Sequence, residues 1–384
     1  MKTTNLISRA LVLAIIALAM SSCNEPSSSE ARESTTVPPE VEEPKTLTLL
    51  GWGDYIPEET LARFTKETGI AIAYQPYENT DEALGRINSE PGRYDVILTD
   101  EDTAAQMRQR KLLGDLDHEQ LPNLANLGRR YADILPDPDY TFSAPYLLGN
   151  TVLVYNTKLV ENPARSWSTL WDPKAVGDGQ VWMLNEPAEV FAMAHLALGH
   201  DMNTTEPADF ETAGNLLLEQ LEKVNVIYNS DVEIARALVE GRCAAAMLYN
   251  SNAAVALGEN EDLEMALPRE GVPLCCDMFL VSRETQRAEL AHVFINFMLE
   301  AEVAAECAEW NWCATPNQRA EEILDPELLA DEVAYPPADV LAKSAFHDTG
   351  KPDRLRLVGV NYRAIMESLR KTTPAMANAP DAEP

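Results

Sequence analysis

The sequence predicts an α/β protein of two lobes, each with a mainly parallel sheet flanked by helices. One observation is size: 384 residues with 46% hydrophobic composition exceed the roughly 250 to 300 residues at which a single core stops growing. The other observation is the order of the expected elements, since short apolar strands alternate with helical stretches from Thr46 onward. This alternation is typical of parallel sheets that are covered by helices.

The first lobe is expected to begin with a strand at Thr46–Leu50. A helix at Pro57–Thr68 follows, because proline suits a first helical position and Gly69 suits a left-handed helix end. The next expected elements are strand Ile70–Tyr74, helix Thr80–Asn88, strand Tyr94–Leu98 and helix Glu101–Lys111.

A long strand at Tyr146–Tyr155, interrupted by Gly149, is interpreted as a crossover between the lobes. The second-lobe elements are expected near Ser168 and at Pro187–Leu198, Asp209–Leu221, Asp231–Glu240 and the strand Ala244–Leu248. The chain then returns through a strand at Asp277–Val281 and a helix at Arg287–Glu309. Lobe 1 is therefore placed at 46–149 plus 275–370, with the C-terminal helices, and lobe 2 at 150–274.

The N-terminus reads as an export signal over residues 1–22. Two basic residues precede the apolar run Ala10–Met20, which is too short to span a bilayer. The segment Met20–Cys23 resembles a bacterial lipobox, so Cys23 is expected to be lipidated and to attach the protein to a membrane; an ordinary cleaved signal is the alternative. Residues 23–45 and 371–384 are rich in polar residues and are expected to be a disordered tether and tail.

The formal net charge of −32 argues against a nucleic-acid partner, since such a chain repels phosphates and anionic headgroups. Solubility or a salty habitat would also explain the acidity. In either case the protein attracts cations.

Motifs for catalysis are missing from the sequence. It contains no G-x-S-x-G, H-E-x-x-H, G-x-x-x-x-G-K or G-x-G-x-x-G segment. The histidines are dispersed and are expected to be solvated or hydrogen-bonded rather than catalytic: His118, His195, His200, His292 and His347. We therefore expect a protein that is not an enzyme, with no catalytic residue, metal or cofactor.

Aromatic and acidic residues recur instead where expected strands end. An aromatic face attracts an ammonium by about 0.5 to 2 kcal/mol, and a carboxylate fixes its position. In parallel sheets such loops meet at one edge, where ligands bind. Each residue alone could equally belong to a core or a solvated surface. The residues are Trp52, Asp54 and Tyr55 after the first strand, Asp100, Glu101 and Asp102 after the third, and Tyr249.

A further acidic pair surrounds Pro187, which marks a helix start. Glu186 comes just before the first turn and Glu189 lies within it, where the helix dipole favours ionised carboxylates. A general preference for acids at helix starts would explain the pair equally well.

With these residues, the chain resembles the periplasmic spermidine/putrescine-binding proteins of ATP-driven (ABC) importers over Leu47 to about Leu369. The resemblance implies a two-lobed type II periplasmic-binding-protein fold with a hinge, a polyamine in the cleft, an ABC permease as partner, and a monomer in the periplasm or at the cell surface. The matching segments are Gly51–Tyr55, Arg63–Ile70, Tyr94–Val96, Glu189–Phe191, Leu267–Gly271 and Thr315–Asn317.

The resemblance also implies roles for residues. Trp52 and Tyr55 would flank the methylene chain, Glu186 and Glu189 would meet ammonium groups from the second lobe, Tyr249 would replace a tryptophan wall, and Asp277 would be the central carboxylate.

Several positions depart from the family pattern. Asp100 and Asp102 stand where a serine and a tyrosine are usual, and His347 stands near a ligand-contacting glutamine. Cys275 and Cys313 replace two aromatic residues, which suggests the hypothesis that they form a disulfide as an apolar wall. Cys276 and Cys307 are the competing partners, and Cys243 would be a buried free thiol.

These departures leave other functions open. The ligand could be another cationic solute, such as thiamine or a basic amino-acid derivative. A ferric-ion receptor would need clustered tyrosines, which the sequence lacks near the expected cleft. An exported thiol enzyme would use Cys275 or Cys276 but lacks a placed histidine.

Overall fold

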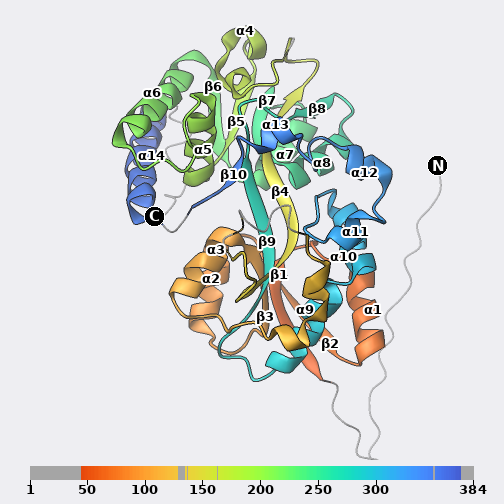
Figure 1. The fold of residues 1–384 in the computed structure, drawn as a ribbon. Coiled ribbons are helices and arrows are strands. Elements are labelled where there is room, and N and C mark those ends of the chain that lie inside the picture. Colours follow the sequence, from red (N-terminus) through yellow and green to blue (C-terminus); the bar gives the residue numbers. More distant parts are fainter. Residues whose placement is uncertain (1–44, 129–134, 136, 162, 349–350, 373–384) are drawn as a thin grey trace, which may run out of the picture. The chain divides into compact units, whose positions relative to one another are not determined.

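The computed structural model describes residues 45–128, 135, 137–161, 163–348 and 351–372 (Figure 1). The expected export signal, Cys23 and the tail beyond residue 372 lie outside the described residues. Within the described part, no helix is long and apolar enough to cross a membrane.

The first sheet is built from the strands expected at the start of the chain. Strands β1 (Thr46–Trp52), β2 (Ala71–Tyr77) and β3 (Val96–Asp100) are parallel, with β1 in the middle. Gly69 ends the first helix with a left-handed φ of 72°, as expected. The connecting helices are α1 (Glu58–Thr68), α2 (Thr80–Ser89) and α3 (Glu101–Gln109).

Two long strands, β4 (Ser143–Asn156) and β9 (Pro273–Val281), run antiparallel beside each other through the middle of the fold (Figure 1). β9 pairs with β3, which places it in the first sheet. β4 pairs with β9 up to Asn150 and with β7 from Thr151. The long strand is therefore shared by two sheets, as the crossover interpretation requires, and it continues through Gly149.

The second sheet repeats the parallel arrangement. Strands β7 (Ala245–Tyr249), β5 (Gln180–Leu184) and β6 (Asn225–Asn229) are parallel, with β5 in the middle. The full strand order is β2-β1-β3-β9-β4-β7-β5-β6, with β8 (Leu263–Ala266) added to β4. Its helices are α5 (Pro187–Ala197), α6 (Pro207–Lys223), α7 (Asp231–Val239) and α8 (Asn250–Glu259).

The helix expected at Arg287–Glu309 is in fact two helices, α9 (Ala288–Met298) and α10 (Ala301–Asn311). Glu300 is extended (φ −63°, ψ 143°). The Leu299 carbonyl accepts hydrogen bonds from the side-chain amides of Asn126 and Asn317, at 3.0 and 2.9 Å. These long-range partners satisfy the carbonyl at the end of α9, so the helix breaks although its apolar pattern continues.

The C-terminal helix α14 (Pro352–Thr372) corrects the expected lobe assignment. It packs on α6 and α5, and the Tyr362 hydroxyl donates to the Asn185 side chain at 2.7 Å. The last helix thus belongs with the second sheet and not with lobe 1. The remaining elements are α4 (Pro173–Val176), α11 (Gln318–Glu321), α12 (Pro326–Ala330), α13 (Ala338–Leu341), β10 (Ala345–Phe346) and single turns at His118–Gln120, Pro122–Asn126 and Trp167–Trp171.

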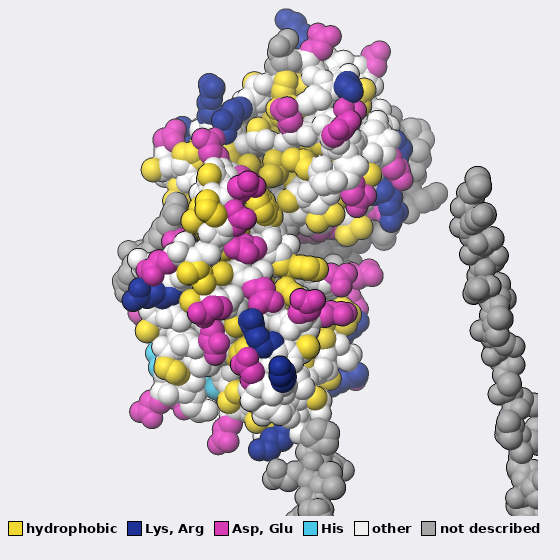
Figure 2. All heavy atoms as spheres, turned by 90° about the vertical axis from the view of Figure 1, so that its right-hand side faces the viewer, with side chains coloured by type: hydrophobic (Ala, Val, Ile, Leu, Met, Phe, Trp, Pro, Cys, Tyr) yellow, Lys and Arg dark blue, Asp and Glu magenta, His cyan; other side chains and the backbone are white. Residues whose placement is uncertain are grey.

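Each sheet has an aromatic core. Phe64 and Phe279 both pack edge-on against Phe294 in the first, and Phe191 packs on Phe210 in the second. On the face shown in Figure 2, acidic side chains cover more of the surface than Lys and Arg, in agreement with the formal charge of −32.

Candidate ligand-binding site

The carboxyl ends of the parallel strands carry the aromatic and acidic residues. Trp52 is the last residue of β1, Asp100 of β3 and Tyr249 of β7. Glu186 follows β5 and occupies the position just before the first turn of α5. Both sheets therefore present ligand-binding chemistry at the edge where α/β proteins bind ligands.

Asp277 of β9 lies opposite Asp100 of β3 in the antiparallel register. Trp52 Nε1 donates to its Oδ1 at 3.0 Å, and the Tyr55 hydroxyl donates to its Oδ2 at 2.7 Å. Burial raises the pKa of Asp277 to about 6, with a further rise from Asp100, against the lowering effect of the two hydrogen bonds. Both donors are neutral, so the carboxylate is held in place but its charge is not balanced by them.

The two aromatic donors are themselves fixed by neighbours. The Trp52 ring lies on Tyr77 with centroids 4.4 Å apart. The Tyr55 ring meets Tyr146 edge-on at 5.6 Å, and the Tyr146 hydroxyl donates to the Tyr55 carbonyl at 2.9 Å. The rings thus orient the carboxylate in this structure; their expected contact with a methylene chain stays a prediction.

Glu186 is accessible to water and its side chain makes no capping hydrogen bond to α5. Protein nevertheless surrounds it closely enough that burial raises its pKa to about 7, with Glu189 and Asp100 adding to the rise. Asp231 and Asp81 contribute further negative charge. Sequence reasoning missed these last two, although Asp231 follows strand β6 and the same strand-end rule could have found it.

Glu189, one turn further along α5, is buried and its two oxygens both have partners. Thr151 of β4 donates to Oε2 at 2.7 Å, and His347 Nε2 contacts Oε1 at 2.8 Å. His347 therefore lies beside Glu189, and its partner in this structure is an acid of the protein; the expected contact of His347 with a ligand stays a prediction. Burial alone would lower the pKa of His347, yet Glu189 and Asp102 outweigh it, so the pKa is raised.

Arg354 of α14 continues this chain of contacts, and sequence reasoning missed it. It is only 1% exposed, and its Nη2 lies 3.3 Å from His347 Nδ1 and 3.3 Å from the Met202 carbonyl. A guanidinium can only donate, so the contact with Nδ1 is a hydrogen bond when His347 is neutral and its Nε2–H donates to Glu189.

Asp100 and Asp102 occupy the start of α3. Asp100 caps the helix by accepting from the Thr103 amide at 2.8 Å and its hydroxyl at 3.0 Å. Burial raises the pKa of Asp102 to about 6, while His347 and Arg354 lower it in part. The intervening Glu101 is buried and accepts from the Cys276 amide at 2.9 Å, so it supports β9.

Asp100, Asp102, Glu186, Glu189 and Asp277, here called the acid cluster, are linked by mutual repulsion. Asp100 raises the pKa of Asp277, Glu186 and Asp102, and Glu189 raises that of Glu186 and Asp102. Among the described residues, no three His, Cys, Asp or Glu are arranged to hold a metal ion.

The hypothesis of a disulfide between Cys275 and Cys313 is wrong in this structure, because every described cysteine is a free thiol. Asn250 contacts Cys313, since its Nδ2 lies 3.6 Å from Cys313 Sγ, and its Oδ1 accepts from the Asn150 amide at 3.0 Å. Cys275 is half-buried, while Cys313 is 2% exposed and donates to the Asn311 carbonyl at 3.3 Å. Cys243 is a buried free thiol, as expected.

The thiols are poor candidates for nucleophilic catalysis. Burial raises the pKa of Cys275 and Cys276 well above the ordinary value, and Glu101 and Asp277 add to the rise. Both stay protonated at neutral pH, whereas a reactive cysteine needs a depressed pKa.

Asp54 and His195 have different surroundings. Asp54 is exposed and has a left-handed backbone conformation (φ 53°), and its carbonyl oxygen accepts a hydrogen bond from Trp310 Nε1 at 3.3 Å. His195 is fully buried, and neither ring nitrogen has a hydrogen-bond partner among the described residues. Burial lowers its pKa to about 4, so it is a neutral core residue and not a solvated one.

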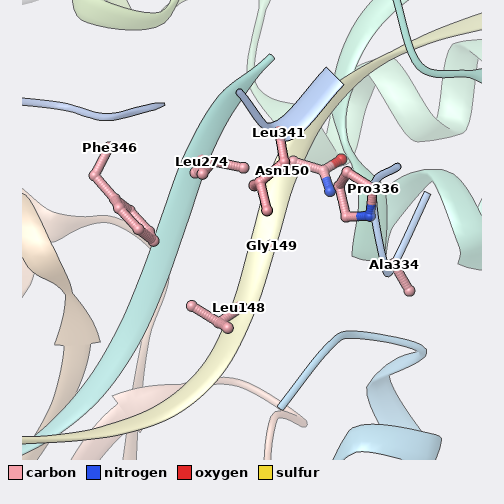
Figure 3. Close-up of a pocket in the computed structure, with 8 residues that line it drawn as sticks. All are labelled: Leu148, Gly149, Asn150, Leu274, Ala334, Pro336, Leu341 and Phe346. Atoms are coloured by element: carbon pink, nitrogen blue, oxygen red, sulfur yellow. The ribbon is translucent and has the colours of Figure 1, made fainter. Parts of the chain in front are cut away.

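A small cavity of about 10 Å³, room for about one water, lies beside β4 and β9 (Figure 3). Side chains alternate between the faces of a strand, so Leu148 and Leu274, which line it, point away from the face that carries Cys275 and Asp277. The cavity is thus separate from the acid cluster. Its other lining residues are Gly149, Asn150, Ala334, Pro336, Leu341 and Phe346.

Comparison with known proteins identifies the family. Residues 59–337 match the model of the bacterial extracellular solute-binding proteins. The chain is 31% identical over 298 residues to the spermidine/putrescine-binding periplasmic protein of Escherichia coli, covering 77% of this chain and 84% of that protein. It is 30% identical over 309 residues to the putrescine/cadaverine-binding protein of Pseudomonas aeruginosa, covering 77% and 86%.

Solved structures of bacterial binding proteins have the same fold as this chain. A spermidine/putrescine ABC transporter substrate-binding protein from Streptococcus pneumoniae, in complex with calcium and HEPES, superposes with a TM-score of 0.78 at 25% identity, covering 85% of this chain and 99% of that one. A lipoprotein of Treponema pallidum shares the fold, with a TM-score of 0.73 at 20% identity over 84% of this chain and 99% of that one. The chain therefore belongs to the bacterial extracellular solute-binding proteins, a non-enzymatic family, and has the two-lobed α/β fold of their periplasmic members.

Proposed function

We propose that this protein captures a linear polyamine between its two lobes and delivers it to the permease of an ABC importer. The observation that carries the proposal is the Asp277 carboxylate, held by Trp52 and Tyr55 beside Asp100. A carboxylate with neutral donors, aromatic neighbours and a raised pKa gains most from an ammonium group. The relatives named for spermidine, putrescine and cadaverine support the same ligand class.

These groups offer gains on the scale that micromolar binding requires, against which the desolvation of charges and the lost freedom of the ligand must be set. Micromolar binding needs about 8 kcal/mol. Two charge-assisted hydrogen bonds contribute about 1.5 to 3 kcal/mol each, and the burial of four methylenes contributes about 3 kcal/mol. Contacts between ammonium groups and the rings add about 0.5 to 2 kcal/mol.

Closure follows from the same contacts. The lobes are taken as 46–149 with 275–351, and 150–274 with α14, and they are joined by β4 and β9. A ligand that bridges Asp277 of the first lobe and Glu186 of the second stabilises the closed state, because only that state offers both acids at once.

The test is calorimetric titration of the purified full-length protein with putrescine, cadaverine, spermidine, thiamine and lysine. At least one polyamine should bind with micromolar or tighter affinity, while thiamine and lysine bind at least tenfold more weakly. Binding of thiamine or lysine without any polyamine would overturn the proposal and would indicate another cationic solute.

We also propose that the protein is a monomer tethered to a bacterial membrane through lipidated Cys23. The segment Met20–Cys23 and the polar stretch after it support this. Replacing Cys23→Ser should release the protein from the membrane fraction, and unchanged partition of the variant would contradict the anchor.

A further inference from the structure

An open hollow of about 620 Å³ lies on the first lobe, at the end of α3 and beside the loop that follows β9. Three of its lining residues are cations and one is an acid, although acids outnumber Lys and Arg by 62 to 30 in the whole chain. The lining residues are Arg108, Lys111, Leu113, Gly114, Asp115 and Arg283. The hollow is therefore a local exception to the acidity of the protein.

Two cations of the hollow have no carboxylate within ion-pair distance among the described residues. They are Lys111 and Arg283, whose side chains are exposed, and Arg283 Nη1 lies 3.5 Å from the Lys111 carbonyl. The third cation, Arg108, pairs with Asp115 at 2.7 Å and lies over the Phe142 ring, 5.0 Å from its centroid. The acid of the hollow is thus already paired, and two positive charges stay available to an anion.

The backbone at Lys111 is one that glycine would suit better. Lys111 follows α3 with a left-handed φ of 61°. Its amide and that of the next residue donate to the carbonyls of Arg108 and Met107, at 3.0 Å each, as in a Schellman helix end. Helices α5 and α7 end with the same two hydrogen bonds, but with Gly199 and Gly241 at this position. The lysine side chain is therefore kept at the hollow against the preference of the backbone, which indicates a function for it.

The hollow lies at the edge of the first sheet where the chain enters β1. Leu113 of its lining pairs with Ser282, which follows β9. The Ser282 amide donates to the Asp95 carbonyl at 3.0 Å, and the Asp95 amide donates to the Thr48 carbonyl of β1 at 2.9 Å. Three such steps between neighbouring strands span about 15 Å. In Figure 1 this edge is the lower end of the first sheet.

This position suits a contact with a membrane surface. Residues 24–45 connect Cys23, the proposed anchor, to the start of β1, so the anchored end of the chain and the hollow belong to the same edge of the sheet. Asp277 lies toward the opposite edge, since the five residues from it to Ser282 span about 16 Å of extended strand. Charges beyond about 8 Å are screened at physiological ionic strength. A contact at the hollow therefore depends on its own cations and not on the net charge of the protein.

We propose that this hollow docks the anchored protein on the phosphate headgroups of anionic lipids, through Arg108, Lys111 and Arg283. Guanidinium and ammonium groups are the side chains that best donate to phosphate oxygens. Docking at this edge leaves the acid cluster uncovered, away from the phosphates that would repel it. The inference rests on the proposed anchor at Cys23 and is independent of which ligand the cleft binds.

The test is sedimentation of the full-length chain with vesicles of phosphatidylcholine and with vesicles that also contain phosphatidylglycerol. All proteins carry Cys23→Ser, so that a lipid anchor cannot mask the contact. The bound fraction should be at least about fivefold higher on the anionic vesicles at low ionic strength, and the difference should shrink as salt is added.

The double variant Lys111→Gln with Arg283→Gln should remove the preference for anionic vesicles. Lys174→Gln with Arg363→Gln is the matched control, because both residues are exposed cations of the second lobe and their loss changes the net charge equally; this variant should keep the preference. Lys111→Gly should lower the preference while raising the melting temperature, since glycine relieves the left-handed backbone. The last variant thus separates headgroup binding from folding.

Equal binding of the parent protein to the two kinds of vesicle would overturn the proposal, and so would a preference that the double variant keeps. Calorimetric binding of inorganic phosphate that the double variant loses, without any vesicle preference, would assign the hollow to free phosphate and would also overturn docking on lipids. Polyamine titration of the double variant should match that of the parent protein. A protein that binds no polyamine would refute the proposed ligand but leave the vesicle result standing.

Discussion

The substitution Asp277→Asn should weaken ligand binding and at the same time stabilise the ligand-free protein. Asparagine keeps the shape of the side chain, so Trp52 Nε1 can still donate to Oδ1, and the Tyr55 hydroxyl can turn to accept from Nδ2. Only the charge is removed. The variant therefore separates the function of the carboxylate from its contribution to packing.

The expected gain in the free energy of unfolding follows from the raised pKa of Asp277. Asp277 shifts from 3.8 to about 6, and one pH unit corresponds to about 1.4 kcal/mol, so ionisation in the folded protein costs at most about 3 kcal/mol. The carboxylate is partly accessible to water, which reduces the expected gain to about 1 to 2 kcal/mol. That gain raises the melting temperature by about 2 to 4 °C.

The energetic penalty of ionising Asp277 depends on pH. Because the folded pKa is raised, the penalty is absent below about pH 4, grows as the pH rises, and is complete above about pH 6. The variant should therefore melt higher than the wild-type protein at pH 7.5 and at the same temperature at pH 4.

The expected loss of binding free energy is that of one charge-assisted hydrogen bond to the ligand, about 1.5 to 3 kcal/mol. Diamine affinity should fall at least tenfold by calorimetry at pH 7.5. Thermal melting of the ligand-free variant at both pH values completes the assay. An unchanged affinity, or a variant that is less stable at pH 7.5, would refute the reasoning.

Three further predictions concern protons, thiols and the hinge strands. Diamine binding at pH 6.5 should release protons, because Glu186 and Asp277 have pKa values of about 7 and about 6 and must ionise to bind an ammonium group. Calorimetry in phosphate and in Tris should therefore give different apparent binding enthalpies, and the affinity should fall at least about tenfold from pH 8 to pH 5. An affinity that does not change with pH would count against a role of these two acids. Alkylation after unfolding without reductant should label all five cysteines from Cys243 onward, and a disulfide-linked peptide would contradict the free thiols. Gly149→Ala should lower the free energy of unfolding by about 1 to 3 kcal/mol, because the added Cβ would lie 2.7 Å from Cys275 Sγ. A second substitution, Cys275→Ala, should restore part of the lost stability. An unchanged melting temperature of the single variant would argue against this close approach.

Local pattern was enough to predict much of the fold. Strand β1, helix α1 and its end at Gly69 follow from apolar runs, proline and glycine, whose effects act within a few residues. The break between α9 and α10 could not be foreseen in this way, since Asn126 and Asn317 reach the Leu299 carbonyl from distant parts of the chain.

The same division applies to the site. The positions of Trp52, Asp100 and Tyr249 at strand ends could be predicted from the sequence, because the strand-end rule needs no distances; their contacts with a ligand stay predictions. Arg354 carries no such signal, because it reaches the site from a C-terminal helix whose packing on α5 and α6 depends on the whole second sheet. The disulfide hypothesis was wrong for a similar reason, since nothing in the spacing of the cysteines shows that each is a free thiol or that Cys313 contacts Asn250.

A crystal structure of the protein with a bound diamine tests the central claim most directly. We expect one ammonium nitrogen within hydrogen-bond distance of the Asp277 carboxylate beside Trp52 and Tyr55, and the other at Glu186, with Glu189 still bound to His347. Density for the diamine away from Asp277, or an ammonium that displaces His347 from Glu189, would contradict the account.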